Sequence, residues 1–460
     1  MLHGGEYDKA RIDECWLKVL HAQFHDILPG SSIEQVYIDS DKDYKEILGA
    51  ARDITDKKLS AIAKRIETEG GILIYNPLGF ARRAEIRLGG EHYITEGEIP
   101  SLGYAVIKPE AHKSDITVSG AVIESPIYTV TLDGDGNIFS IIDKRCDREV
   151  LSESAARIAF FEDFPHEYDA WELDKDYATK EYAPEFLGMC PVHDGDRAGY
   201  ACHYRYMSSE ITKTVWLYSG SARIDIETEV DWRERHQIMK LLFPLDVHTQ
   251  NASFEIQYGH TERPTHRNTS WDEARFEVCA HKWVDLSESG YGVALLNDSK
   301  YGFSVNENTI SVSCLRGPTW PNPNADLGEH RFTVSLLPHI GTLQDGNVMK
   351  EAYMLNQPAE FMEIGKQSGN MPESYSLVSV DEPSVIIEGV KRAEDGDGCI
   401  VRLYEAHGGK TEAHVRLGEH FAHAYLCDLT ESPREELPIT DGVITLYMTN
   451  FDIETIRLIK

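Results

Sequence analysis

The sequence has no closely spaced cysteines. Its eight cysteines stand far apart, and no two of them are separated by only two residues. In a chain of 460 residues this spacing excludes a disulfide framework or a cysteine-rich zinc site as the basis of the fold. We therefore expect the cysteines to be free thiols, most of them buried.

Long apolar runs and an excess of basic residues are also missing. No stretch of 18 apolar residues occurs, so no membrane-spanning helix is predicted, and the first residues lack the features of a secretion signal. This combination predicts a cytoplasmic protein. Lys and Arg number 45 against 77 Asp and Glu, a formal net charge of −32. Such a surface repels phosphate groups, so neither nucleic acid nor a membrane is an expected partner.

Helical periodicity dominates the first 70 residues. Apolar side chains recur at helical spacing over residues 7–28 and from residue 31 to about 68, with Pro29-Gly30 between the two stretches. Ser31 and Glu34 have the spacing of a capping box at the start of the second helix. The two helices are expected to pack as an antiparallel hairpin.

Strand periodicity follows from Ile72 onward. Strict alternation of apolar and polar residues is clearest over residues 223–230, and Gly, Pro and Asn turns recur at short intervals. The predicted fold is α+β multidomain, with an N-terminal helical hairpin followed by mainly antiparallel β-sandwich domains. The predicted boundaries are a helical domain 1–70, a small β domain 71–118, a large β-sandwich 119–357 and a C-terminal β-sandwich 358–460.

The end of the first predicted helix carries two histidines. His21 and His25 are four residues apart, which places both on one side of a helix and allows them to bind a transition metal. Ala22 stands where a zinc metalloprotease motif needs glutamate. By spacing alone, ordinary histidines on a helix surface explain the pair as well.

The segment QFHDILPGSS (residues 23–32) resembles a signature of glycoside hydrolase family 38 α-mannosidases, in the form found in bacterial and cytosolic members. Further matching stretches follow in the order of the family and extend to about residue 360. They are IYNPLGFARR (74–83), LDGDGNIFSIIDK (132–144), YDAWELD (168–174), EVDWRERHQIMKLLFP (229–244), the long run 262–302, and LRGPTWPNPNADLGEHRFTVSLLPHIG (315–341).

The resemblance implies a retaining, zinc-dependent α-mannosidase that hydrolyses terminal α-mannosides of oligosaccharides. It places one Zn2+ ligand on His25 and puts Asp26 against the sugar, and it makes the two helices part of a three-helix bundle. The family's nucleophile and remaining zinc ligands come from an N-terminal catalytic domain. We therefore expect that domain as a partner in cis or in trans, no catalytic residue in this chain, and no activity from the chain alone. A homo-oligomer is a further expectation.

Other candidates for sugar contacts lie in two loops. Tyr168, Asp169 and Trp171 bring a carboxylate and two aromatic rings close together, which suits a mannose pocket and equally suits a core at a strand edge. His266 and Arg267 stand in a polar loop that either binds substrate or is held by internal salt bridges. The run Pro318–Pro321 is predicted to pack a loop.

Two acidic stretches have a structural interpretation. Glu227, Glu229 and Asp231 alternate along a predicted strand and are expected to face solvent. Asp133 and Asp135 resemble the start of a calcium loop, but the glycine and glutamate that such a loop requires are missing, so a turn is predicted. The alternative function is a non-catalytic carbohydrate-binding or scaffolding protein built from β-sandwiches, which has no need of a metal-binding helix.

Overall fold

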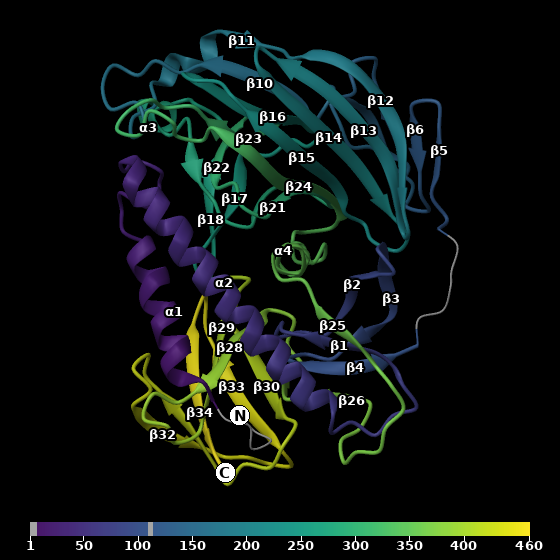
Figure 1. Cartoon of the computed structure of the whole chain (residues 1–460), viewed down its shortest axis with the longest axis vertical. Coiled ribbons are helices and arrows are strands. Elements are labelled where there is room, and N and C mark those ends of the chain that lie inside the picture. Colours follow the sequence, from purple (N-terminus) through teal and green to yellow (C-terminus); the bar gives the residue numbers. More distant parts are fainter. Residues whose placement is uncertain (1–6, 109–113) are drawn as a thin grey trace.

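The computed structural model describes residues 7–108 and 114–460. Two helices, α1 (Lys9–Ala22) and α2 (Glu34–Ala63), lie side by side as the predicted hairpin, and most of the remaining chain is strand (Figure 1). All the ladders between named strands are antiparallel, as in the predicted α+β fold. No helix among the described residues is both long and apolar enough to cross a bilayer.

The first helix is shorter than predicted. It ends at Ala22, and residues 23–30 form successive turns in which Ile27 N–H donates to the Phe24 carbonyl and Gly30 N–H to the Ile27 carbonyl. Pro29 disfavours the α conformation in the residue before it, and Gly30 adopts a φ of 83°. His25 therefore lies outside the helix, and its predicted position on one helix face with His21 is wrong.

The predicted capping box at Ser31 is also wrong. The N-cap of α2 is Ile33, which makes no side-chain capping bond. The hydroxyl of Tyr37, one turn into the helix, satisfies this part of the loop instead: it accepts from Ser32 N–H at 2.8 Å and faces the Asp26 and Ile27 carbonyls at 3.2 and 3.4 Å. Burial raises the pKa of Tyr37, so the hydroxyl keeps its proton and donates.

Two large sheets form the upper part of Figure 1. The wider sheet joins nine strands, in spatial order β12 (Glu185–Asp194), β13 (Arg197–Tyr206), β14 (Ser209–Tyr218), β15 (Ile224–Trp232), β24 (Gly328–Ile340), β21 (Tyr291–Asn297), β20 (Trp283–Glu288), β17 (Asn251–Ile256) and β18 (Gly259–Pro264). The second sheet joins β11 (Glu181–Tyr182), β10 (Arg157–Glu162), β16 (Gln237–Pro244), β23 (Thr309–Arg316), β22 (Gly302–Asn306) and β19 (Val278–Cys279).

The core of this sandwich lies between the two sheets. Phe160 of β10 stacks on Tyr206 of β13, with ring centroids 3.6 Å apart, and lies 6.2 Å from Trp232 of β15. Strand β15 shows the predicted alternation in part: Ile226 and Val230 are buried and Glu229 is exposed on the other face, but Asp225 on that face is buried too, paired with Arg223. Apolar side chains on one face of each strand therefore account for the packing.

Smaller elements surround the sandwich. A five-stranded sheet of β5 (Thr117–Ser119), β6 (Val122–Glu124), β7 (Tyr128–Leu132), β8 (Ile138–Asp143) and β9 (Arg148–Glu149) packs on its side. Between β7 and β8, one oxygen of Asp133 accepts the backbone N–H groups of Asp135 and Asn137, both at 2.9 Å, which confirms the predicted turn. Short helical segments are η1 (Lys175–Thr179), α3 (Ser270–Ala274) and α4 (Val348–Asn356).

The lower part of Figure 1 holds the remaining strands. One sheet joins β25 (Glu360–Ile364), β1 (Gly71–Asn76), β4 (Gly103–Ile107) and β26 (Ser374–Ser376), beside the hairpin β2 (Arg82–Leu88) and β3 (Glu91–Ile99). It takes strands from both sides of the boundary predicted at residue 357, and the predicted division into domains stays a prediction. The C-terminal sandwich comprises β27 (Val378–Val380), β30 (Thr411–Leu417), β33 (Val443–Met448), β28 (Val385–Arg392), β29 (Cys399–Glu405), β34 (Ile453–Ile459), β31 (His423–Cys427) and β32 (Pro433–Leu437).

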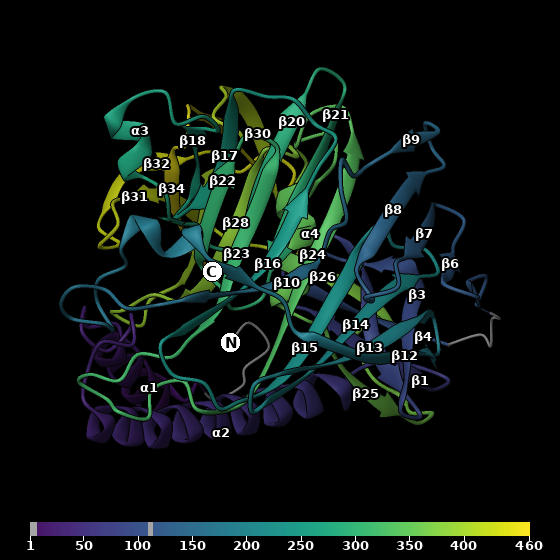
Figure 2. The ribbon, with the colours of Figure 1, turned by 90° about the horizontal axis from the view of Figure 1, so that it is seen from above.

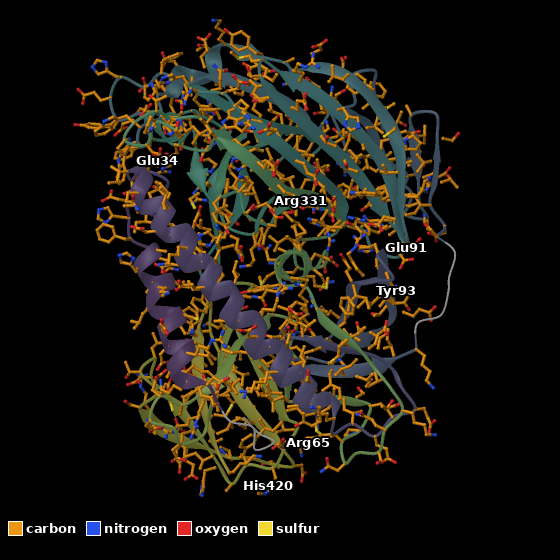
Figure 3. All side chains as sticks on the ribbon, viewed as in Figure 1. Glu34, Arg65, Glu91, Tyr93, Arg331 and His420 are labelled. Carbon is orange, nitrogen blue, oxygen red and sulfur yellow. The ribbon has the colours of Figure 1, made fainter. Side chains whose placement is uncertain are left out.

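Helix α2 connects the two parts of the molecule. Figure 2 shows it along one edge of the structure, and Figure 3 labels Glu34 and Arg65 at its two ends. Glu34 accepts from the side-chain amide of Asn324 in the β23–β24 loop at 3.0 Å. At the other end, Ile66 forms a bridge with Met371. The tip of the helical hairpin is therefore held against the loops at one end of the large sandwich.

Candidate functional site

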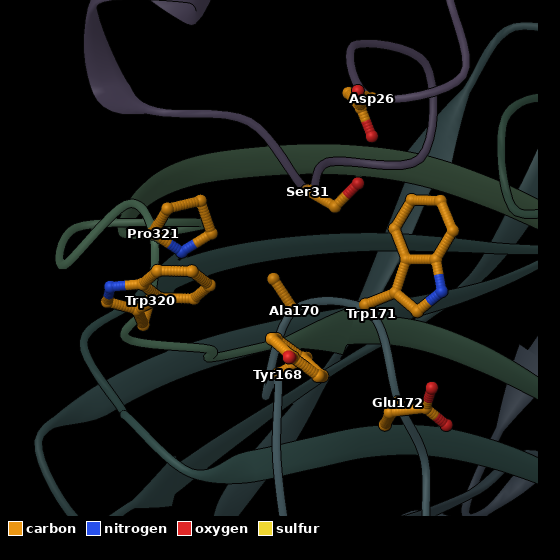
Figure 4. A pocket seen from close by; sticks show the side chains of 8 residues that line it. All are labelled: Asp26, Ser31, Tyr168, Ala170, Trp171, Glu172, Trp320 and Pro321. Carbon is orange, nitrogen blue, oxygen red and sulfur yellow. The ribbon is translucent and has the colours of Figure 1, made fainter.

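Three loops from distant parts of the sequence meet at the tip of the helical hairpin. They are the α1–α2 loop (residues 23–33), the β10–η1 loop (163–174) and the β23–β24 loop (317–327). Together they enclose a cleft of about 350 Å3, shown in Figure 4. The side chains that line it are Asp26, Ser31, Tyr168, Ala170, Trp171, Glu172, Trp320 and Pro321. A few polar groups among aromatic rings are typical of small-molecule sites.

The α1–α2 loop contributes the polar edge of the cleft. The carboxylate of Asp26 lines the cleft, and the imidazole of His25 lies next to it, with Nε2 3.5 Å from Asp26 Oδ2. The His25 side chain is 70% exposed, so its ring is free to contact a further group. The Tyr37 hydroxyl donates to the backbone carbonyl of Asp26 and so holds this loop.

Three aromatic rings form the walls. Tyr168, Trp171 and Trp320 are each more than half exposed, and the rings of Tyr168 and Trp320 lie 6.2 Å apart. Figure 4 shows Trp171 and Trp320 on opposite sides, with Ala170 and Tyr168 between them. Tyr168 has a φ of 54°, and its carbonyl accepts from the N–H groups of Trp171 and Glu172 in a tight turn. This turn brings both aromatic side chains of the loop to the cleft.

One ion pair at the base of the cleft connects two of the loops. Asp163, at the end of β10, is buried and pairs through both oxygens with the guanidinium of Arg316 at the end of β23. The same guanidinium donates to the backbone carbonyl of Glu172. A bidentate, charge-assisted pair with a planar fork restricts the relative positions of the two loops.

The structure brings together part of the predicted set of site residues. Asp26, Tyr168 and Trp171 line one cleft, and His25 lies at its edge. Asp169 does not line the cleft, because its carboxylate is directed at the backbone of residues 319 and 320. His266 and Arg267 lie between β18 and α3 and do not line it either, and His266 Nδ1 is 3.8 Å from Asp272 in the first turn of α3. Their assignment to substrate stays a prediction.

Five of the lining residues are not among the predicted site residues. Trp320 and Pro321 belong to the run predicted to pack a loop, and Ser31, Ala170 and Glu172 were not predicted to contact a ligand. The prolines beside Trp320 do not indicate that its ring is exposed, because this exposure depends on the position of the β10–η1 loop. A short polar segment next to the aromatic run at 168–171 was the only signal for Glu172.

Zinc in proteins takes about four ligands, mainly His, Cys and carboxylates. His25 and the adjacent Asp26 offer an imidazole and a carboxylate of that kind. Among residues 7–108 and 114–460 no group of three or more His, Cys, Asp and Glu side chains is placed to hold a metal ion. The donor set therefore fits part of a zinc ligand set, and it is not complete among the described residues.

Three family models match the sequence, and together they cover both sides of the cleft. The α-mannosidase middle domain matches residues 1–62, the family 38 glycosyl hydrolase C-terminal domain residues 123–324, and the family 38 C-terminal β-sandwich domain residues 384–456. The chain belongs to glycoside hydrolase family 38. His25 and Asp26 fall in the match to the middle domain, whereas the aromatic walls fall in the match to the C-terminal domain.

Similar proteins of known name support this family assignment. The family-38 chain is 34% identical to human α-mannosidase 2C1 over 98% of its own length and 46% of that protein. It is 30% identical to a Saccharomyces cerevisiae α-mannosidase over 89% of its length and 39% of that protein. The chain thus spans about half the length of the curated relatives it matches. An α-mannosidase structure from Enterococcus faecalis V583 shares the fold, with a TM-score of 0.83 at 14% identity, over 98% of this chain and 64% of that one.

Proposed function

We propose that this chain forms one side of the active site of a retaining, zinc-dependent α-mannosidase that acts on terminal α-mannosides of oligosaccharides. The observation that carries the proposal is the exposed His25 imidazole beside Asp26, at the edge of an aromatic-walled cleft. A purely carbohydrate-binding protein requires the aromatic walls, but it does not require an exposed His–Asp pair.

The residues of the cleft have distinct proposed roles. His25 is one zinc ligand, and Asp26 accepts hydrogen bonds from sugar hydroxyls. Tyr168 and Trp171 cover the less polar face of the sugar ring. When bound, zinc acts as a Lewis acid that holds and polarises substrate oxygens. The chain's own residues position the sugar and exclude water from one side of it.

The nucleophile and the remaining zinc ligands are assigned to an N-terminal catalytic domain, present in cis or in trans. One imidazole with a neighbouring carboxylate binds zinc weakly, and binding of the sugar without a nucleophile does not lower the chemical barrier. The chain by itself is therefore proposed to be inactive. The cytoplasmic location and the homo-oligomer stay predictions.

The helical hairpin offers a surface for that domain. It exposes large apolar side chains, each more than half accessible, at Trp16, Leu17, Leu20, Phe24, Leu28, Ile38 and Leu48. Large apolar side chains left exposed in this number are typical of protein interfaces. Phe24 and Leu28 of this set lie in the α1–α2 loop on either side of His25, so a domain that covers them reaches the proposed zinc ligand. The lengths of the relatives, about twice that of this chain, are consistent with a further domain of sufficient size.

The direct test compares the chain alone with the assembled enzyme, meaning the chain together with the N-terminal catalytic domain. Hydrolysis of p-nitrophenyl α-mannoside is expected only from the assembled enzyme supplied with zinc. Zinc-dependent turnover by the chain alone would contradict the assignment of the nucleophile to another domain. Binding of mannosides without turnover in the assembled enzyme would favour the carbohydrate-binding alternative.

A paired substitution tests the zinc ligand. His25→Ala in the assembled enzyme is expected to weaken zinc retention by more than about 100-fold, because it removes a direct ligand. His21→Ala is the matched control, since His21 lies in the last turn of α1 and does not line the cleft. Zinc is measured by metal analysis after dialysis. Equal losses from both variants would overturn the assignment of His25.

A further inference from the structure

One carboxylate binds the two residues of the β23–β24 loop that place the Trp320 ring. Asp169 Oδ2 accepts from the backbone N–H of Thr319 at 2.6 Å and from its hydroxyl at 2.9 Å. Asp169 Oδ1 accepts from the backbone N–H of Trp320 at 3.0 Å. Both oxygens are therefore directed at the β23–β24 loop, and Asp169 is absent from the lining of the cleft.

These contacts join two loops that share no strand ladder at this point. Asp169 belongs to the β10–η1 loop, between Tyr168 and Trp171, and its partners belong to the β23–β24 loop. A nearby side chain adds to the connection, because His236 Nε2 lies 3.5 Å from the Thr319 hydroxyl. Together with the Arg316 contacts at the base of the two loops, this carboxylate therefore sets the position of Trp320 relative to Trp171.

Trp320 itself makes few contacts that account for its position. It is 60% exposed, and the only aromatic contact found for its ring among the described residues is with Tyr168, at 6.2 Å and an interplanar angle of 47°. A large apolar ring held open to solvent by hydrogen bonds to its backbone is arranged for a ligand rather than for the core. Pyranose rings present C–H faces that pack on such a surface.

We propose that Trp320 is a sugar-contacting wall of the cleft and that Asp169 is a positioning residue that fixes it, rather than a ligand of the sugar. This inference rests on the proposed α-mannosidase function. Two hydrogen bonds from Thr319 and one from the Trp320 backbone to one carboxylate orient this part of the loop, and the indole lies opposite Trp171 across the cleft (Figure 4). The ligand class is a neutral pyranoside, because the walls present aromatic surface and the polar edge presents carboxylates.

The test measures inhibition of the assembled enzyme by methyl α-mannoside, with p-nitrophenyl α-mannoside as the substrate. Trp320→Ala is expected to weaken inhibition about 10-fold, and Trp320→Phe to restore most of it, because the aromatic face remains. Trp271→Ala is the control, since Trp271 is 75% exposed on α3 and does not line the cleft. Unchanged inhibition in Trp320→Ala would overturn the assignment of Trp320.

A double-mutant cycle tests the role of Asp169. Asp169→Ala alone is expected to weaken inhibition nearly as much as Trp320→Ala, and to have little further effect when Trp320 is already alanine. Thr319→Ser, which keeps both hydrogen-bond donors, is expected to behave like the wild type. Additive effects of the two alanine substitutions would mean that Asp169 contacts the sugar itself and would refute the positioning role.

These outcomes are separate from failure of the proposed function. If the unsubstituted assembled enzyme shows no turnover of the mannoside, the α-mannosidase proposal fails. If the unsubstituted assembled enzyme hydrolyses the mannoside, but neither Trp320→Ala nor Asp169→Ala changes its inhibition by methyl α-mannoside, only the present inference fails. Circular dichroism of each variant establishes that it is folded, and Trp320→Phe remains informative if the alanine variant is not.

Discussion

A lysine buried in the large sandwich permits a quantitative prediction. Lys213 of β14 is fully buried, and its ammonium donates to the carbonyl of Ala156 at 2.6 Å and lies 5.2 Å from the Tyr204 ring centroid. No carboxylate pairs with it among the described ion pairs. Burial lowers the pKa of Lys213 from 10.5 to about 8. The charged lysine therefore opposes folding at neutral pH.

The magnitude follows from this change in pKa. One pKa unit corresponds to about 1.4 kcal/mol, so burial of the charged form costs about 3 kcal/mol. Since the folded pKa is lowered, the unfolded chain binds more protons between pH 8 and 10.5, and stability due to this group rises with pH across that window. Lys213→Met removes the charge but leaves the Ala156 carbonyl without a donor. We expect a net stabilisation of about 1–2 kcal/mol at pH 7.

The assay is urea denaturation at several pH values from 7 to 10.5, followed by tryptophan fluorescence. The stability difference between Lys213→Met and the wild type is expected to shrink as the pH rises and then to reverse sign. Lys240→Met is the matched control, because Lys240 is also buried but pairs with Glu277, so its loss is expected to destabilise by about 3 kcal/mol. A difference for Lys213→Met that is independent of pH, or a large destabilisation at pH 7, would refute the reasoning.

Two further predictions concern the junctions between parts of the molecule. Burial raises the pKa of Glu351 on α4 to about 7, so its protonated form stabilises the fold at low pH and this contribution is lost as the pH rises from 4.5 through 7. Glu351→Gln is expected to remove that loss of stability. Melting temperatures between pH 4 and 8 measure it, and a pH profile of the melting temperature that is the same in the variant and the wild type would contradict the prediction. Gly79→Ala places a Cβ atom 2.2 Å from the Ile387 carbonyl and is expected to destabilise by about 2 kcal/mol, whereas Gly49→Ala, with open space in α2, is expected to stabilise by about 0.5 kcal/mol. Thermal or urea denaturation measures both, and equal effects would contradict the contact at Gly79.

The sequence alone determined that a pair of helices comes first and that mainly antiparallel strands follow. Helical spacing before residue 64 and alternation after residue 71 reflect which side chains each element buries, and this periodicity is a local property. The family and the position of the His25–Asp26 segment also followed from short stretches of residues. The sequence alone did not show that His25 leaves the helix, because the turns after Ala22 depend on Pro29, Gly30 and the Tyr37 hydroxyl together.

Only the tertiary structure decided which loops form the cleft. Trp320 and Tyr168 are 152 positions apart, and their proximity results from the pairing of β10, β16 and β23 in one sheet, which no local pattern encodes. The same holds for Asp169: its residue type suits a sugar contact, but its hydrogen-bond partners come from another loop. Local periodicity sets what each segment buries, whereas long-range packing sets which side chains remain exposed and which neighbours they meet.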